Sequence, residues 1–82
     1  MGSINRPPIY LDQPEAIGRR LRILRDRAGL TSADLGADAG IDSRTVRRFM
    51  AGESMVLAGR IAGLFLAPGY RVRLELEPIN AP

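Results

Sequence analysis

The sequence predicts a mostly α-helical domain of four to five helices, followed by one β-strand that forms a two-stranded sheet between two chains. Three observations support this fold class. Residues 12–67 place apolar residues at helical spacing, with glycines where helices would end. Residues 70–77 instead alternate apolar and charged residues, as a half-buried strand does. A length of 82 residues suits one small domain with arms.

The composition excludes several kinds of site. The chain contains no Cys and no His, so it lacks the usual zinc ligands, a disulfide framework, a His base and a Cys nucleophile. We therefore expect no cofactor and no enzymatic activity. All twelve basic residues are arginine and the net charge is +3, which favours a polyanionic partner, although arginine is also common on solvated surfaces.

The predicted organisation has four segments. Residues 1–11 form an N-terminal arm, because Pro7 and Pro8 do not fit a helix interior. Residues 12–67 form the helical domain, residues 68–78 the dimerisation strand, and residues 79–82 a short tail. The N-terminus has no apolar signal segment and no stretch approaches a membrane span, so we expect a cytoplasmic protein.

The first helix is predicted to begin at Asp12 and to end at Gly29. Asp12 and Glu15 have the spacing of a capping box, and Pro14 fits the first helical turn. One face of this helix is apolar: Ile17, Leu21, Leu24 and Ala28. We expect the arginines of the other faces (Arg19, Arg20 and Arg22) to be mainly solvated.

Two short helices are predicted next. Thr31 and Asp34 can cap the second helix, which ends at Gly40. Asp42 or Ser43 caps the third helix, which ends at Gly52. The buried residues of this pair are Leu35, Ala39, Ile41, Val46 and Phe49.

A fourth helix is predicted from Ser54 to about Leu66, before Pro68 and Gly69 break the chain. Its inner face comprises Val56 or Leu57, with Ile61, Leu64 and Phe65.

The second and third helices fit a helix-turn-helix, because only Gly40, Ile41 and Asp42 separate them. Gly36 allows a close approach of the two helices, and Gly40 supplies a turn conformation that a Cβ would penalise. The third helix then has a free face of Ser43, Arg44, Arg47 and Arg48. Arginines on such a face can bind guanine in the major groove or clamp phosphates.

The run from Leu30 to Phe49 resembles the lambda-repressor/Cro (XRE) helix-turn-helix, and the likeness extends over about residues 13–66. The C-terminal strand and the Ile9-Tyr10 segment resemble the HipB branch of antitoxins, which repress their own operon. The resemblance implies a bacterial, homodimeric transcriptional regulator, most often a repressor of a pseudo-palindromic operator. The alternative is an antitoxin whose main role is to bind a toxin protein, with autoregulatory DNA binding.

The resemblance also implies which residues contact DNA. Ser43, Arg44, Arg47 and Arg48 match base-contacting positions, whereas Thr31 and Ser32 match phosphate-binding positions. Ser32 departs from the family, in which glutamine is usual. Met50 stands where the family often has a glutamate that pairs with the arginine matched by Arg25, so we expect Arg25 either to bind phosphate or to be solvated.

The predicted strand is the dimerisation element, since a lone strand needs a partner for its backbone groups. Its residues are Tyr70, Arg71, Val72, Arg73, Leu74, Glu75, Leu76 and Glu77, and Pro78 ends it. In an antiparallel pair centred on Leu74, Arg73 faces Glu75 and Arg71 faces Glu77. Opposite charges in such pairs contribute ~0.2–1 kcal/mol each. Pairing with residues 9–11 of the same chain is the alternative.

Overall fold

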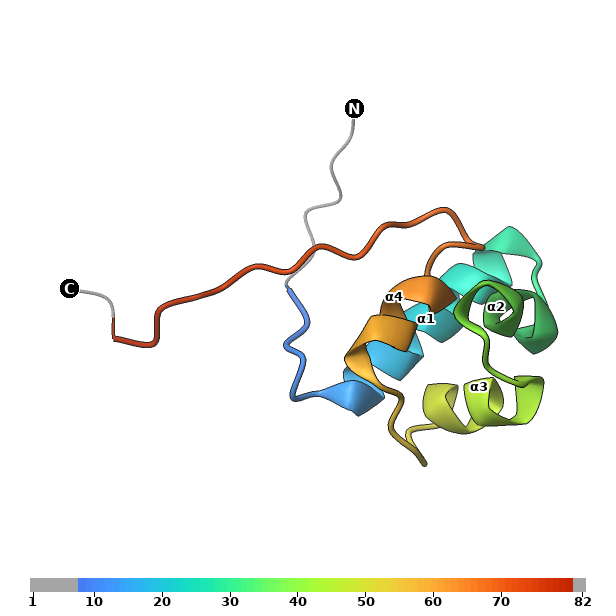
Figure 1. Ribbon diagram of the computed structural model, residues 1–82, viewed down its shortest axis with the longest axis horizontal. Coiled ribbons are helices and arrows are strands. Elements are labelled where there is room, and N and C mark those ends of the chain that lie inside the picture. Colours follow the sequence, from blue (N-terminus) through green and yellow to red (C-terminus); the bar gives the residue numbers. More distant parts are fainter. Residues whose placement is uncertain (1–7, 81–82) are drawn as a thin grey trace.

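The structure, a computed structural model, describes residues 8–80; residues 1–7 and 81–82, which include most of the predicted arm and the end of the predicted tail, lie outside it. The helices are α1 Pro14–Ala28, α2 Ser32–Ala39, α3 Ser43–Met50 and α4 Ala58–Leu64. Figure 1 shows them as one cluster, from which residues 70–80 extend away. The mostly α-helical fold with four helices is therefore confirmed. Within residues 8–80, no helix has the length and apolar character needed to cross a membrane.

The start of α1 differs from the prediction. Gln13 is the N-cap residue without a side-chain capping bond, and Pro14 is the first helical residue. The predicted capping box at Asp12 is wrong, because the Gln13 N–H donates to the Tyr10 carbonyl over 2.9 Å and closes a turn that leaves Asp12 outside the helix. Proline supplies the helical φ at this position without losing a hydrogen bond. The predicted end at Gly29 is confirmed.

The predicted caps of α2 and α3 are confirmed in detail. The Thr31 hydroxyl accepts a hydrogen bond from the Asp34 N–H over 3.1 Å, and the Asp34 carboxylate accepts one from the Thr31 N–H over 2.9 Å. Asp42 caps α3 by accepting a hydrogen bond from the Thr45 N–H over 2.7 Å. Each bond satisfies an N–H group that the helix itself leaves unpaired.

Two glycines shape the turn between α2 and α3. A Cβ at Gly36 would overlap the carbonyl oxygen of Ile41 and press on the side chain of Val46. Gly40 has φ 68°, in the left-handed region that disfavours residues with a Cβ. Close approach at Gly36 and the backbone of Gly40 together fix the angle between the two helices.

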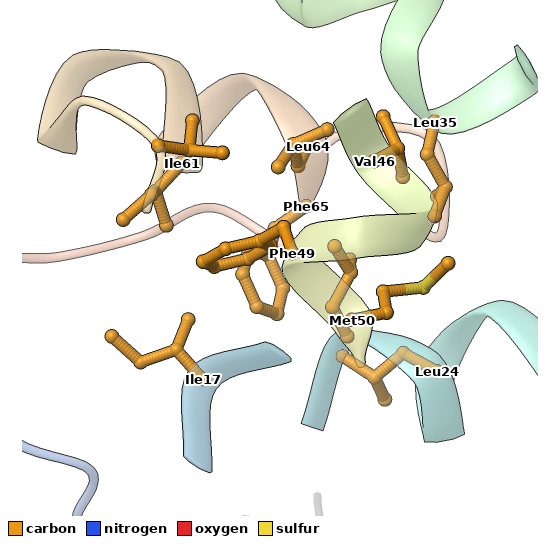
Figure 2. Close-up of a cluster of buried hydrophobic side chains, with 11 residues drawn as sticks. Ile17, Leu24, Leu35, Val46, Phe49, Met50, Ile61, Leu64 and Phe65 are labelled. Atoms are coloured by element: carbon orange, nitrogen blue, oxygen red, sulfur yellow. The ribbon is translucent and has the colours of Figure 1, made fainter. Parts of the chain in front are cut away.

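One apolar core joins the four helices, as Figure 2 shows. Its members are Ile17, Leu21, Leu24, Leu35, Val46, Phe49, Met50, Val56, Ile61, Leu64 and Phe65. The prediction of Val46 and Phe49 as core residues is confirmed. Ala28, in contrast, is exposed in the last turn of α1, so its predicted inward position is wrong.

Helix α4 is shorter than predicted at both ends. It begins at Ala58 rather than Ser54, and it ends at Leu64 rather than Leu66. In the loop before α4, Val56 is buried in the core and Leu57 is 77% exposed. Of the two residues predicted for the inner face, Val56 is therefore the buried one.

The C-terminal segment does not form the predicted strand within one chain. No residue between 8 and 80 is in a strand, and residues 70–78 run as an exposed segment away from the helices. The alternative pairing with residues 9–11 is also not formed. The sequence pattern identifies a segment able to join a sheet, but residues 8–80 of one chain supply no second strand for its backbone groups.

Candidate nucleic-acid interface

Helix α3 divides sharply into a buried face and a charged face. Val46, Phe49 and Met50 are buried in the core, and this fixes the rotation of the helix about its axis. Arg44, Arg47 and Arg48 are exposed on the other side, and none of them forms an ion pair within the described residues. Ser43 is half-buried at the first turn. The structure therefore brings the four predicted base-contacting residues to one helix, with three arginines available to a ligand.

The N-terminus of α3 is held by Asp42. The hydrogen bond from the Thr45 backbone is the main cause that holds the pKa of Asp42 below its ordinary value, and the nearby Arg44 lowers it further. The carboxylate is thus ionised at neutral pH, as a helix N-terminus favours. This anchor keeps the first turn, with Ser43 and Arg44, in a defined position.

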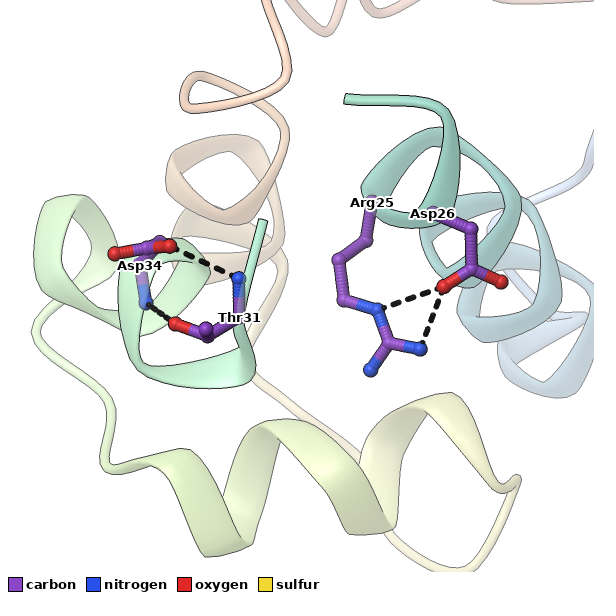
Figure 3. Close-up of polar contacts among 4 residues, drawn as sticks. All are labelled: Arg25, Asp26, Thr31 and Asp34. Atoms are coloured by element: carbon purple, nitrogen blue, oxygen red, sulfur yellow. Dashed lines mark hydrogen bonds and ion pairs between the residues drawn. The ribbon is translucent and has the colours of Figure 1, made fainter. Parts of the chain in front are cut away.

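At the start of α2, Thr31 is exposed to solvent and Ser32 is buried. Thr31 is exposed and forms the reciprocal pair of hydrogen bonds with Asp34 that Figure 3 shows. Its own hydroxyl hydrogen stays available, since the oxygen is the acceptor in the cap. Ser32 is only 8% exposed, so its side chain offers little surface to a phosphate.

Arg25 lies near the end of α1 and pairs with its sequence neighbour. Its Nη2 lies 2.7 Å from Asp26 Oδ1, and its Nε donates to the same oxygen over 3.2 Å (Figure 3). The side chain is 22% exposed. Met50 is buried in the core, and its apolar side chain offers no charge that could pair with this guanidinium. The structure thus gives Arg25 a partner that the sequence comparison does not anticipate.

Arg60 of α4 is a residue that sequence reasoning misses. Its Nη1 donates a hydrogen bond to the carbonyl oxygen of Gly40 over 2.6 Å. Gly40 is the C-cap residue of α2, where backbone carbonyls lack helical partners and carry partial negative charge. Arg60 therefore stabilises the turn between α2 and α3 from a third helix, α4. Because the two residues are 20 positions apart, no local sequence motif predicts this contact.

The remaining arginines of α1 show no common site. Arg19 and Arg22 are exposed, and Arg20 is half-buried. None of the three has an ion-pair partner within residues 8–80, in keeping with the expectation of a mainly solvated surface.

Two short helices joined by a three-residue turn, with an arginine-bearing second helix, define a helix-turn-helix protein. The family model described as a helix-turn-helix domain matches residues 16–65, which is more than half of the chain. The chain belongs to this family of DNA-binding domains. Searches of curated proteins and of solved structures found no match.

Proposed function

We propose that the protein is a transcriptional regulator that binds a specific double-stranded DNA sequence as a homodimer and acts as a repressor. The observation that carries the proposal is the exposed face of α3, where Arg44, Arg47 and Arg48 lie together with no acidic partner among the described residues. An α-helix fits the major groove, and arginine can bind the O6 and N7 atoms of guanine through two hydrogen bonds.

In this proposal α2, the first helix of the motif, contacts the DNA backbone. Thr31 is the best placed phosphate contact, since it is exposed at the start of α2. Arg25 can bind a phosphate only if its ion pair with Asp26 breaks. Because the side chain of Ser32 is buried, this residue contributes mainly through its backbone N–H. Phosphate contacts of this kind orient a protein on the duplex without selecting a sequence.

Homodimer formation is proposed through residues 70–77. One module of this size buries only ~600–1,000 Å² on DNA, so a second copy adds the affinity that a single copy lacks. Two recognition helices spaced by about 34 Å would contact successive major grooves of a pseudo-palindromic site. The alternating pattern Arg71, Arg73, Glu75 and Glu77 supports an antiparallel pairing of two copies.

A second candidate function is that of an antitoxin, for which the main partner is a toxin protein. The exposed C-terminal segment favours this candidate, because its apolar residues have open surface for another protein: Leu74, Leu76 and Ile79. The two candidates share the DNA-binding surface and differ in what covers the segment. Neither proposal includes enzymatic activity or a cofactor.

The test is a gel-shift titration with the DNA upstream of the protein's own gene, at several salt concentrations. A DNA-binding regulator gives high affinity for one sequence and a steep fall of the affinity with salt. Equal affinity for unrelated duplexes would overturn the proposed sequence-specific function. Co-expression with the product of an adjacent gene separates the antitoxin, which would then elute as a stable complex with that product.

A further inference from the structure

Helix α3 is held in place by close contacts with two other helices. A Cβ at Gly18 of α1 would overlap the carbonyl oxygen of Phe49 and lie 3.2 Å from the Cα of Met50, so the backbones of α1 and α3 touch there. A Cβ at Gly36 of α2 would lie 3.3 Å from Val46 Cγ2. Contacts this close prevent α3 from rotating about its axis. The direction of each side chain on α3 is therefore fixed relative to the core.

The three arginines of α3 lie at different angles to the core. Successive residues of an α-helix turn by about 100°, and the three buried side chains of α3 (Figure 2) define the inward direction. Arg44 and Arg48 then lie within about 30° of the outward direction, whereas Arg47 lies about 75° from it. All three are exposed. Arg44 and Arg48 thus occupy the centre of the exposed face, and Arg47 lies at its side.

Arg44 and Arg48 are one helical turn apart and available to a ligand. Residues at i and i+4 of a helix have Cβ atoms about 5–6 Å apart, and successive base pairs of B-DNA are about 3.4 Å apart. Two such side chains on a helix in the major groove therefore reach bases one or two base pairs apart. Within residues 8–80, neither guanidinium group forms an ion pair or a hydrogen bond with another side chain.

The other side chains of α3 leave guanine as the base that this face recognises best. Asn and Gln, which bind adenine through two hydrogen bonds, are absent from the helix. The large apolar side chains that could contact the methyl group of thymine are buried. Ser43 and Thr45 are half-buried. Arginine remains, and it binds O6 and N7 of guanine with two parallel hydrogen bonds.

We infer that the DNA segment bound by one α3 helix contains two guanines, one or two base pairs apart, which Arg44 and Arg48 bind, and that Arg47 binds a phosphate. The inference rests on the proposed sequence-specific DNA binding. The outward direction of an inserted helix points at the base edges on the floor of the groove, whereas its sides face the phosphates that border the groove. Three residues that the sequence pattern groups together thus have two different roles.

The first experiment selects bound sequences with the full chain from a pool of duplexes that have a randomised centre. We expect the enriched sequences to share two guanines with the inferred spacing. An enriched sequence without such guanines overturns the inference and leaves the proposed function standing. A pool in which no sequence is enriched overturns the proposed sequence-specific function itself, so the two failures are distinguishable.

The second experiment changes single groups of the two selected guanines. The analogue 7-deazaguanine lacks N7, whereas hypoxanthine keeps O6 and N7 and lacks only the amino group in the minor groove. We expect 7-deazaguanine at either position to raise the Kd about tenfold, through the loss of one hydrogen bond from a charged donor, and hypoxanthine to leave the Kd within about twofold. Equal effects of the two analogues would overturn a contact through the major groove.

The third experiment assigns each guanine to its arginine. In Arg44→Ala, 7-deazaguanine should have no further effect at one of the two positions and its full effect at the other. Arg48→Ala should show the reverse pattern. Circular dichroism checks that both variants are folded. If both positions stay sensitive in both variants, the assignment to Arg44 and Arg48 is wrong.

Arg47→Ala is the matched variant, because it removes the same side chain from the side of the helix. We expect it to raise the Kd by the same factor for every duplex and to keep the preference for the two guanines. The slope of log affinity against log salt should become shallower by about one, as the loss of one phosphate contact predicts. Loss of the preference at either guanine would give Arg47 a base contact and overturn the division of roles.

Discussion

Arg60 donates a hydrogen bond from Nη1 to the carbonyl oxygen of Gly40 over 2.6 Å, and this bond joins α4 to the turn between α2 and α3. We expect Arg60→Gln to lower the free energy of unfolding by about 1 kcal/mol, as the loss of one such hydrogen bond does. Urea unfolding followed by circular dichroism measures the change. Arg22→Gln is the control, because Arg22 is exposed and forms no ion pair among residues 8–80. Equal losses for the two variants would show that Arg60 contributes only its charge.

The arginines of α3 should control DNA affinity. We expect Arg44→Ala or Arg48→Ala to weaken binding to the specific site by ~1–3 kcal/mol and to relax sequence preference if the side chain contacts a base. Arg22→Ala on α1 lowers the net charge by the same amount and controls for general electrostatics. Fluorescence anisotropy with a labelled duplex measures all three proteins. Similar losses for the α1 and α3 variants would argue against base contact by α3.

The capping box of α2 should contribute to stability. Thr31→Ala removes the acceptor of the Asp34 N–H, and we expect the free energy of unfolding to fall by about 1 kcal/mol. Thr31→Ser keeps the hydroxyl and should retain most of the stability. Thermal unfolding of the three proteins at one concentration provides the comparison. An Ala variant as stable as the wild type would mean that solvent replaces the cap.

Acid should destabilise the helix-turn-helix through its two capping carboxylates. Backbone hydrogen bonds from Thr31 and Thr45 are the main cause that holds the pKa values of Asp34 and Asp42 below their ordinary value of 3.8. Because the folded pKa is lower than the unfolded one, this stabilisation is present above pH 3.8 and is lost as the pH falls through the folded values.

The double variant Asp34→Asn/Asp42→Asn tests this pH dependence. Asn cannot titrate but still caps a helix, so the variant should lose less stability than the wild type between neutral pH and the acid range. Urea midpoints measured at a series of pH values give both curves. Parallel curves would assign the acid sensitivity to other carboxylates.

The charges of residues 71–77 should determine which chains pair. Residues 71, 73, 75 and 77 share one face of the segment when it is extended. Arg71→Glu/Arg73→Glu makes all four residues acidic, and Glu75→Arg/Glu77→Arg makes all four basic. We expect each variant alone to be monomeric where the wild type is a dimer, because like charges then face one another. An equimolar mixture should form a heterodimer, which light scattering detects. Helical content by circular dichroism confirms that each variant is folded.

Dimers of either variant alone would overturn the antiparallel register centred on Leu74. A folded mixture that stays monomeric would overturn the role of these charges.

Local signals explain which parts of the fold could be predicted. The spacing of Thr31 and Asp34 suffices to predict their cap, because both partners lie within one helical turn. The positions of Val46 and Phe49 likewise predict the exposed side of α3, since burying one side of a short helix fixes the other.

The errors arise where a local pattern competes with a contact from elsewhere in the chain. Asp12 has the right spacing for a cap, yet the turn from Tyr10 to Gln13 excludes it from α1. Arg60 carries no local signal, because its acceptor lies 20 residues away. The segment 70–78 has the alternation of a strand, but pairing depends on a second strand, and the described part of the chain contains none.

The exposed segment 70–78 has a consequence for the proposed control of a gene by a dimer. If DNA is bound only after two such segments pair, the binding-competent species grows with the square of the monomer concentration while the protein is scarce. Operator occupancy would then respond steeply to copy number, and a repressor of its own gene would switch off expression over a narrow range of protein level. The dimer Kd, more than the affinity of α3 for bases, would set that threshold.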